Sequence, residues 1–148
     1  RRGSGQGRLL VICCIPVRSA RCYAGPMADL TPSHDHDWPA QLDALTAAQR
    51  HHTLMFENDL VRVLETKVPP GETTAVHTHC WPAALYVVSP GDFVRRDDKG
   101  NVLLDTRMNG AQGKAGDAAW SPPLGPHTLE NVGTTLIHVI NVELKRSY

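Results

Sequence analysis

Residues 71–91 read GETTAVHTHCWPAALYVVSPG and combine a glycine turn, two spaced histidines and a run of β-forming residues. Gly71 ends a Pro-Pro-Gly turn, His77 and His79 stand one residue apart, and a run rich in β-forming residues continues to Pro90-Gly91. Side chains at positions i and i+2 of a β-strand point to the same face, so this spacing predicts two adjacent imidazoles. They are either half of a metal site or two polar residues packed on a half-buried strand.

The chain around this stretch alternates with the period of β-strands. An Asn58-Asp59 turn precedes alternating valines and Arg62, and residues 98–101 predict a hairpin turn. The last predicted strand carries Leu136, His138, Ile140 and Val142 on one face, which we expect to be the core face. One short helix is predicted over residues 39–50. Short strands separated by Gly and Pro over about 95 residues predict an all-β, antiparallel sandwich or small barrel.

The bulk composition limits the classes of partner. A chain of 148 residues suits one domain, and equal numbers of basic and acidic residues, 15 each, provide no field to attract nucleic acid. The longest apolar run is about half of the ~20 residues that a membrane-spanning helix needs. We therefore expect a small-molecule substrate or ligand, with no nucleic acid and no membrane as partner.

The N-terminal residues call for a separate interpretation. Residues 1–26 contain no methionine, and a soluble start follows at Met27. They are either a partial targeting signal, which predicts export or an organelle, or translated upstream sequence, which fits their scattered arginines better and predicts a cytoplasmic protein. The expected organisation is an extension over residues 1–26, a linker plus short helix over 27–52, and the barrel over 53–148. Cysteines at 13, 14, 22 and 80 form no disulfide framework, so we expect reduced thiols.

A third imidazole is available downstream. His127 follows a rigid Pro- and Gly-rich segment, residues 122–126. With His77 and His79 it would complete a set of three neutral nitrogen ligands with positions left open for water or substrate. Such a set predicts a divalent transition metal (Fe, Zn, Ni or Mn) rather than magnesium or calcium.

These residues resemble the two motifs of the cupin superfamily. The first, G-x5-H-x-H-x4-E-x6-G, fits Gly71, His77, His79 and Gly91, whereas the usual glutamate falls on Ala84. The second, G-x5-P-x-G-x2-H-x3-N, nearly fits, with its glycine one residue late, on residues Gly116, Pro122, Gly125, His127 and Asn131. The resemblance covers about residues 53–145. It implies an antiparallel jelly-roll barrel, here with one short N-terminal helix, a divalent metal inside, and a homodimer.

The missing glutamate narrows the comparison. A cupin with only three histidine ligands looks like the thiol-dioxygenase branch, in which iron sits on three imidazoles. We therefore expect a metal-binding cupin that acts on or binds a small molecule, dioxygenase-like in its site. The alternative is a non-catalytic ligand-binding or sensor cupin with weak metal binding or none. Whether the protein is an enzyme stays open.

Two aromatic residues are candidates to flank the metal ligands. Tyr86 would share an inward face with Ala84, although a packed core aromatic is its better interpretation, and Trp81 either walls the pocket or packs outside it. For the other residues a structural role is the better interpretation: His51 and His52 at the helix end, Cys80, Trp120, His138, and His34 and His36 in a solvated arm. We expect an apolar cavity lined by Val76, Ala84 and Val88. One cation could come from Arg62, Lys67, Arg95 or Arg107.

Overall fold

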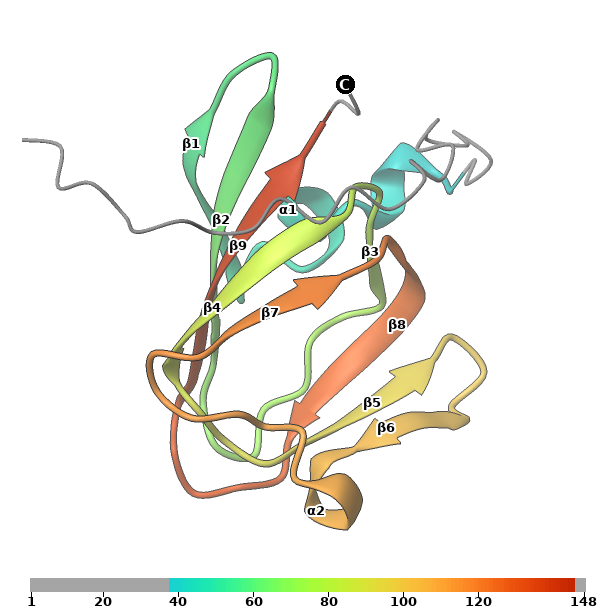
Figure 1. Ribbon diagram of the computed structural model, residues 1–148. Coiled ribbons are helices and arrows are strands. Elements are labelled where there is room, and N and C mark those ends of the chain that lie inside the picture. The colour runs from blue at the N-terminus through green and yellow to red at the C-terminus, as the bar shows by residue number, and fades with distance from the viewer. Residues whose placement is uncertain (1–37, 146–148) are drawn as a thin grey trace, which may run out of the picture.

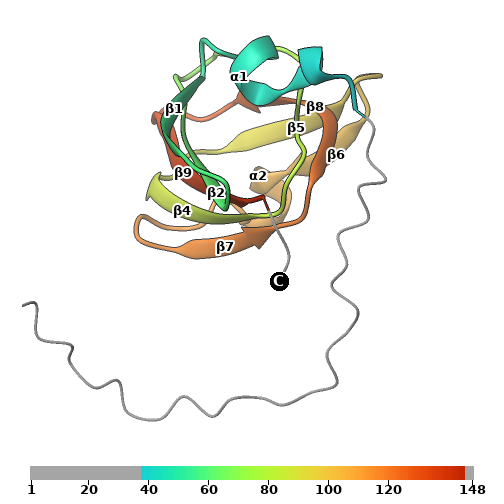
Figure 2. The ribbon, with the colours of Figure 1, turned by 90° about the horizontal axis from the view of Figure 1, so that it is seen from above.

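The computed structural model describes residues 38–145, which form two antiparallel β-sheets facing each other around an interior (Figure 1; Figure 2). The five-stranded sheet has the order β1-β2-β9-β4-β7, with β1 (His52–Glu57), β2 (Val61–Val68), β9 (Ile137–Leu144), β4 (Ala83–Ser89) and β7 (Ala118–Ser121). The four-stranded sheet has the order β3-β8-β5-β6, with β3 (His77–His79), β8 (Leu124–Asn131), β5 (Phe93–Asp97) and β6 (Val102–Asp105). The predicted all-β, antiparallel class is confirmed.

The predicted helix before the barrel consists of two short pieces. A 3-10 turn, η1 (Ala40–Leu42), is followed by α1 (Ala44–Ala47), and Asp43 separates them. The Asp43 carboxylate caps α1 by accepting a hydrogen bond from the Leu45 amide at 3.0 Å. A further short helix, α2 (Thr106–Asn109), was not predicted. In Figure 2, α1 lies at the rim of the barrel beside β1.

The predicted turns are confirmed by their side-chain hydrogen bonds. Asn58 Oδ1 accepts from the amides of Leu60 and Val61, which closes the β1–β2 hairpin. Asp97 Oδ1 accepts from the amides of Lys99 and Asn101, which closes the β5–β6 hairpin. Asx side chains stabilise such turns because they mimic the backbone hydrogen bonds of the turn itself.

The interior face of the large sheet is the opposite of the one that the apolar alternation predicted. Residues Ile137, Val139, Asn141 and Glu143 of β9 point inward, whereas His138, Ile140 and Val142 lie on the outer face. β2 shows the same inversion, since Arg62, Leu64, Thr66 and Val68 are its buried residues. On both strands the inner face mixes polar and apolar side chains, so hydrophobic alternation by itself does not identify it.

Two motif residues tie the strand ends together. A Cβ on Gly91 would lie 2.8 Å from Ile137 Cγ1, so only glycine fits where β4 passes the start of β9. Asn131, the last residue of β8, is fully buried and donates hydrogen bonds to the carbonyls of Val68 at 2.7 Å and Thr135 at 2.8 Å. These contacts hold β8 against the end of β2.

Some predictions concern residues outside the described range. The extension over residues 1–26 and the His34 and His36 pair both lie there. Within residues 38–145, neither short helix nor the 3-10 turn has the length and apolar content to cross a membrane.

Candidate metal centre

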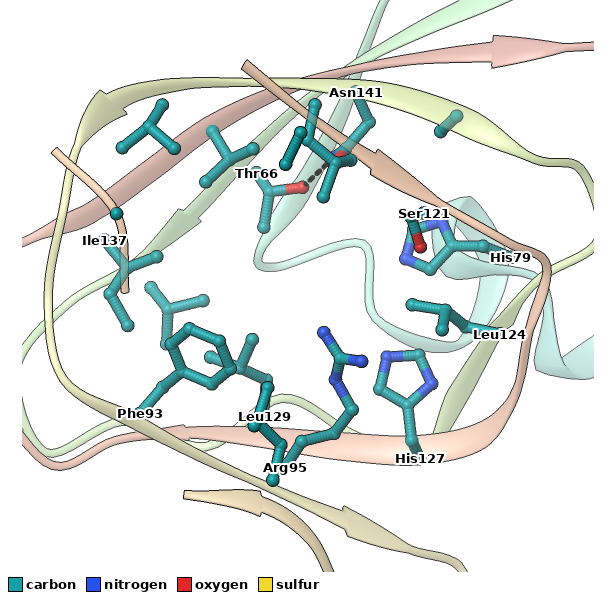
Figure 3. A pocket seen from close by; sticks show the side chains of 18 of the residues that line it. Thr66, His79, Phe93, Arg95, Ser121, Leu124, His127, Leu129, Ile137 and Asn141 are labelled. Carbon is teal, nitrogen blue, oxygen red and sulfur yellow. Dashed lines mark hydrogen bonds between the residues drawn. The ribbon is translucent and has the colours of Figure 1, made fainter. Parts of the chain in front are cut away.

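Four imidazoles gather on one side of the barrel interior. Two come from β3, His77 and His79; His127 comes from β8; His52 is the first residue of β1. His77 lies opposite His127 in the β3–β8 pair, and their ring centroids are 4.3 Å apart. The His79 ring lies 5.2 Å from that of His77 and 5.8 Å from that of His127. The three histidines singled out in the sequence therefore lie in one cluster, of which Figure 3 shows His79 and His127 on the same side of the cavity.

His52 was missed as a member of this cluster. Its ring centroid lies 4.6 Å from that of His77 and 5.4 Å from that of His79. One ligand nitrogen from each of these three residues lies within 4.8 Å of the others, a group compact enough to hold one ion. The interpretation of His52 as a helix-end residue was incomplete: its Nδ1 does donate to the Ala48 carbonyl at the end of α1, at 3.2 Å. Only the pairing of His52 with Thr66 on β2 turns its ring inward.

Each imidazole of the cluster directs the same nitrogen at an oxygen acceptor. His77 Nδ1 bonds the Ala75 carbonyl at 2.9 Å, His127 Nδ1 bonds the Gly125 carbonyl at 2.7 Å, and His52 Nδ1 bonds the Ala48 carbonyl. A carbonyl oxygen can only accept, so in a neutral imidazole the proton sits on Nδ1 and Nε2 keeps its lone pair. In metal sites, a hydrogen bond from the nitrogen that does not bind the metal orients each histidine ligand.

The fourth imidazole is held by a buried carboxylate. His79 Nδ1 lies 2.7 Å from Glu143 Oε1, and Arg62 Nε donates to Glu143 Oε2 at 2.6 Å. Arg62 also donates to Asp43 at 2.9 Å and lies 4.6 Å from the centroid of the Trp81 ring. Glu143 is fully buried, so the Arg62 charge and the hydrogen bond to His79 are both needed to offset its lost hydration. The chain Asp43–Arg62–Glu143–His79 thus connects the helix cap to the cluster.

The surrounding protein keeps the imidazoles of His52, His77 and His127 neutral. Burial is the largest cause that lowers their pKa from 6.5 to about 3. Neighbouring imidazoles contribute to this lowering for all three, and Arg95 contributes for His77 and His127. A neutral imidazole is the form that binds a metal, so the environment of the cluster fits metal coordination.

The cluster borders a cavity of about 370 Å³ between the two sheets. Besides the histidines, its polar lining includes Thr66, Ser121 and Asn141, and Asn141 Nδ2 donates to Thr66 Oγ1 at 2.7 Å (Figure 3). The rest is mostly apolar, with Phe93, Leu129 and Ile137 opposite the histidines. This volume suits a small ligand.

The cavity wall from β4 differs by one residue from the prediction. Ala83, Leu85 and Val87 line the cavity, whereas Ala84 and Tyr86 lie exposed on the outer face. The expectation that Ala84 and Tyr86 point inward is therefore wrong, and neither Val76 nor Val88 lines the cavity. Pro82 precedes the strand, so the two-residue period cannot be carried from His79 across it.

Of the remaining candidates, only Trp81 lines the cavity. Trp81 packs on Arg62, whereas Trp120, expected to be packed, is 61% exposed. His138 has a partner as predicted, Glu65 at 2.9 Å, but on the outer face. The Cys80 thiol is half-buried, and burial raises its pKa.

Of the four cations considered, only Arg95 lines the cavity. Arg62 is paired with Glu143, Lys67 with Glu65, and Arg107 with Asp105.

An antiparallel double sheet with a buried histidine cluster inside defines a cupin-type barrel. No model of a known protein family matches the sequence, and no curated protein matches it. Among solved structures, the chain is similar to a cupin domain from Bordetella pertussis Tohama I, with 21% identity, 64% of this chain and 92% of that chain covered, and a TM-score of 0.50.

Two further likenesses are weaker. A conserved double-stranded β-helix protein from Klebsiella pneumoniae has 24% identity, 64% and 75% coverage and a TM-score of 0.46. The polyketide cyclase RemF from Streptomyces resistomycificus has 20% identity, 68% coverage of both chains and a TM-score of 0.45. By the Bordetella likeness, this chain has the cupin fold, as the motifs predicted.

Proposed function

We propose that this protein binds a divalent transition metal at the histidine cluster and uses it to bind or convert a small molecule in the barrel cavity. His52, His77 and His79 would hold the ion, with His127 beside them as a further ligand. The observation that carries the proposal is the shared orientation of the four rings, each with Nδ1 on an oxygen acceptor. A metal bound there would supply Lewis acidity or, if it is iron, redox chemistry.

Metal content of the purified protein tests this proposal. We expect about one metal ion per chain in the wild type, and loss of the ion in His77→Ala. His52→Ala should also lower the metal content, because it removes one of the three nitrogens that lie within 4.8 Å of one another. His138→Ala is the matched control, since His138 pairs with a glutamate as His79 does but faces outward. Equal metal content in the wild type and His77→Ala after reconstitution with iron, zinc, nickel or manganese would rule the site out.

One observation favours the non-catalytic alternative. No pair of carboxylates lines the cavity among residues 38–145, and Asp117, the one acidic residue in its lining, lies exposed at the loop before β7. General acid–base catalysis by the protein would need such groups next to the ligand. Oxygen uptake or product formation with a bound ligand would identify an enzyme, and ligand-dependent thermal stabilisation without turnover would identify a binding module.

We further propose a homodimer through the outer face of the five-stranded sheet. Its register aligns one apolar residue from each strand in a continuous row: Phe56, Val63, Val142, Ala84 and Trp120. Trp120 is 61% exposed and Phe56 53%. A continuous apolar row on a sheet suits a symmetric partner, because a two-fold axis brings the same surface of a second copy onto it.

The oligomeric state in solution tests the dimer. Light scattering on the full chain should show a dimer for the wild type and a monomer for Tyr86→Arg, which adds a charge beside the row. Leu103→Arg is the control, since Leu103 is 58% exposed, against 49% for Tyr86, but lies on β6 of the other sheet. A monomeric wild type, or a Tyr86→Arg variant that stays dimeric, contradicts the proposed interface.

A further inference from the structure

Arg95 is a cation inside the cavity without a counter-ion. Arg95 lies on β5 opposite Leu129 of β8. His127 lies two residues before Leu129 on β8, so Arg95 and His127 are diagonal neighbours across the strand pair. Figure 3 shows the guanidinium directed into the cavity next to the His127 ring. No residue in the described part of the chain forms an ion pair or a side-chain hydrogen bond with it, and its guanidinium carbon lies 5.9 Å from the centroid of the Phe93 ring.

The same cavity contains the residues whose buried polar atoms lack hydrogen-bond partners. Within residues 38–145, two buried side-chain atoms have no hydrogen-bond partner, Arg95 Nε and Gln112 Oε1. Both residues line the cavity. A buried donor on a charged group is costly when it has no partner, so an uncompensated arginine in a fold suggests that something outside the protein compensates it.

The charges around the cluster also require an anion. Asp43, Arg62 and Glu143 together carry one net negative charge. The proposed divalent ion and Arg95 would carry three positive charges between them. Asp117, the one acidic residue in the lining, is exposed, and its Oδ2 accepts the Lys114 amide at 2.8 Å. The interior would therefore hold excess positive charge unless a small anion entered with the metal.

We propose that Arg95 binds the carboxylate of a small anionic substrate or ligand whose remaining donor atoms reach the metal centre. The inference rests on the proposed function, since it names the class of molecule that the same cavity takes. A guanidinium matches a carboxylate through two parallel hydrogen bonds. One arginine in a largely apolar cavity suits a carboxylate better than a phosphate, which has more charge and more oxygens to satisfy. A hydroxyl on the ligand would give Gln112 Oε1 the donor that it lacks.

Calorimetric titration of the full-length protein, both metal-free and zinc-loaded, tests this site. The probes are lactate, its neutral analogue lactamide, and inorganic phosphate. We expect lactate to bind and to lose about 10- to 100-fold in affinity in Arg95→Met, which keeps an unbranched stem but removes the charged donors. Lactamide should bind the wild type as weakly as lactate binds Arg95→Met.

The control variant is Arg96→Met on the same strand. The Arg96 side chain is partly exposed and lies 4.0 Å from the Glu130 carboxylate. The Arg96→Met protein should bind lactate within about twofold of the wild type, because exposed charges contribute little. Arg95→Met should also unfold at a higher temperature than the wild type without ligand, since it removes an unpaired buried cation. Arg95→Lys, which keeps the charge but not the planar fork, should bind lactate with intermediate affinity.

The outcomes separate this inference from the proposed function. Unchanged lactate affinity in Arg95→Met, failure of the wild type to bind lactate, or tighter binding of phosphate than of lactate would overturn the carboxylate site. A destabilised Arg95→Met would also overturn it, because it would show that Arg95 holds the fold together. Metal content measured on the same samples reports separately on the histidine cluster. Arg95-dependent lactate binding by protein that takes up no metal would sustain this site while refuting the metal.

Discussion

Glu143→Gln is expected to lower the free energy of unfolding by about 3–5 kcal/mol and to weaken metal binding by about 10- to 100-fold. The Glu143 carboxylate is fully buried, and each oxygen accepts one hydrogen bond, from Arg62 Nε and His79 Nδ1. Glutamine offers one oxygen and one NH2 group in their place, so one donor would face another donor. Arg62 would also lose the buried charge that offsets its own and would retain only Asp43.

The loss of metal affinity follows from the tautomer of His79. If the glutamine turns its NH2 group to His79, that ring must accept at Nδ1 and carry its proton on Nε2. Nε2 is the nitrogen that a metal would use, and a protonated nitrogen cannot be a ligand. If the glutamine turns the other way, the penalty falls on Arg62. Both orientations lower stability, and the first also blocks the metal site.

Glu65→Gln is the matched control for this prediction. Glu65 also pairs with a histidine, His138, at 2.9 Å, but the pair lies on the outer face and both residues are partly exposed. Such pairs contribute about 0–1 kcal/mol. Chemical denaturation gives the stabilities and competition with a chromophoric chelator gives the metal affinities. Similar values for the two variants would show that the buried carboxylate does not orient the cluster.

The metal-free protein is expected to lose stability steeply as the pH falls below 6.5. The pKa of His52, His77 and His127 is about 3 in the folded state and 6.5 without the surrounding protein. Between these values the unfolded chain binds three protons that the folded chain does not, so acid favours unfolding. Each proton contributes about 1.4 kcal/mol per pH unit well below pH 6.5. The full stability is present above pH 6.5 and the loss continues down to about pH 3.

Unfolding midpoints check this expectation when they are measured on metal-free protein between pH 8 and pH 4. His52→Leu should reduce the steepness by about one third, because two protons remain to be taken up instead of three. A midpoint that stays constant from pH 7 to pH 5 would mean that the imidazoles titrate normally and are therefore hydrated rather than buried. Bound metal should shift the loss to lower pH, since protons and metal compete for the same nitrogens.

The faces of the large sheet show where sequence reasoning stops. The last strand reads Ile137-His138-Val139-Ile140-Asn141, and the apolar positions favoured the face that contains Ile140. The barrel interior instead receives Asn141, bonded to Thr66, and Glu143, bonded to His79. A binding cavity needs polar groups inside, and the outer face stays apolar along its central row. Alternation predicts that a strand has two different faces, but it does not identify the inner one.

The candidate site was predictable to the extent that its residues are local. His77 and His79 share a face because they belong to one short strand, and the motif spacing brought in His127. His52 lies in neither motif and reaches the cluster only because β1 pairs with β2 and places it opposite Thr66. Arg95 was one of four candidate cations until the β5–β8 register placed it next to His127.

The antiparallel β class, the hairpin turns and the paired imidazoles on β3 were predictable from the residues, because they depend on positions close together along the chain. Only the folded barrel shows which face of each strand is inside, that Ala83 rather than Ala84 lines the cavity, and that His52, Glu143 and Arg95 belong to the site. These outcomes depend on strand register and on pairing between distant segments. Register is set by the packing of the whole barrel, and a shift of one residue exchanges the two faces of a strand.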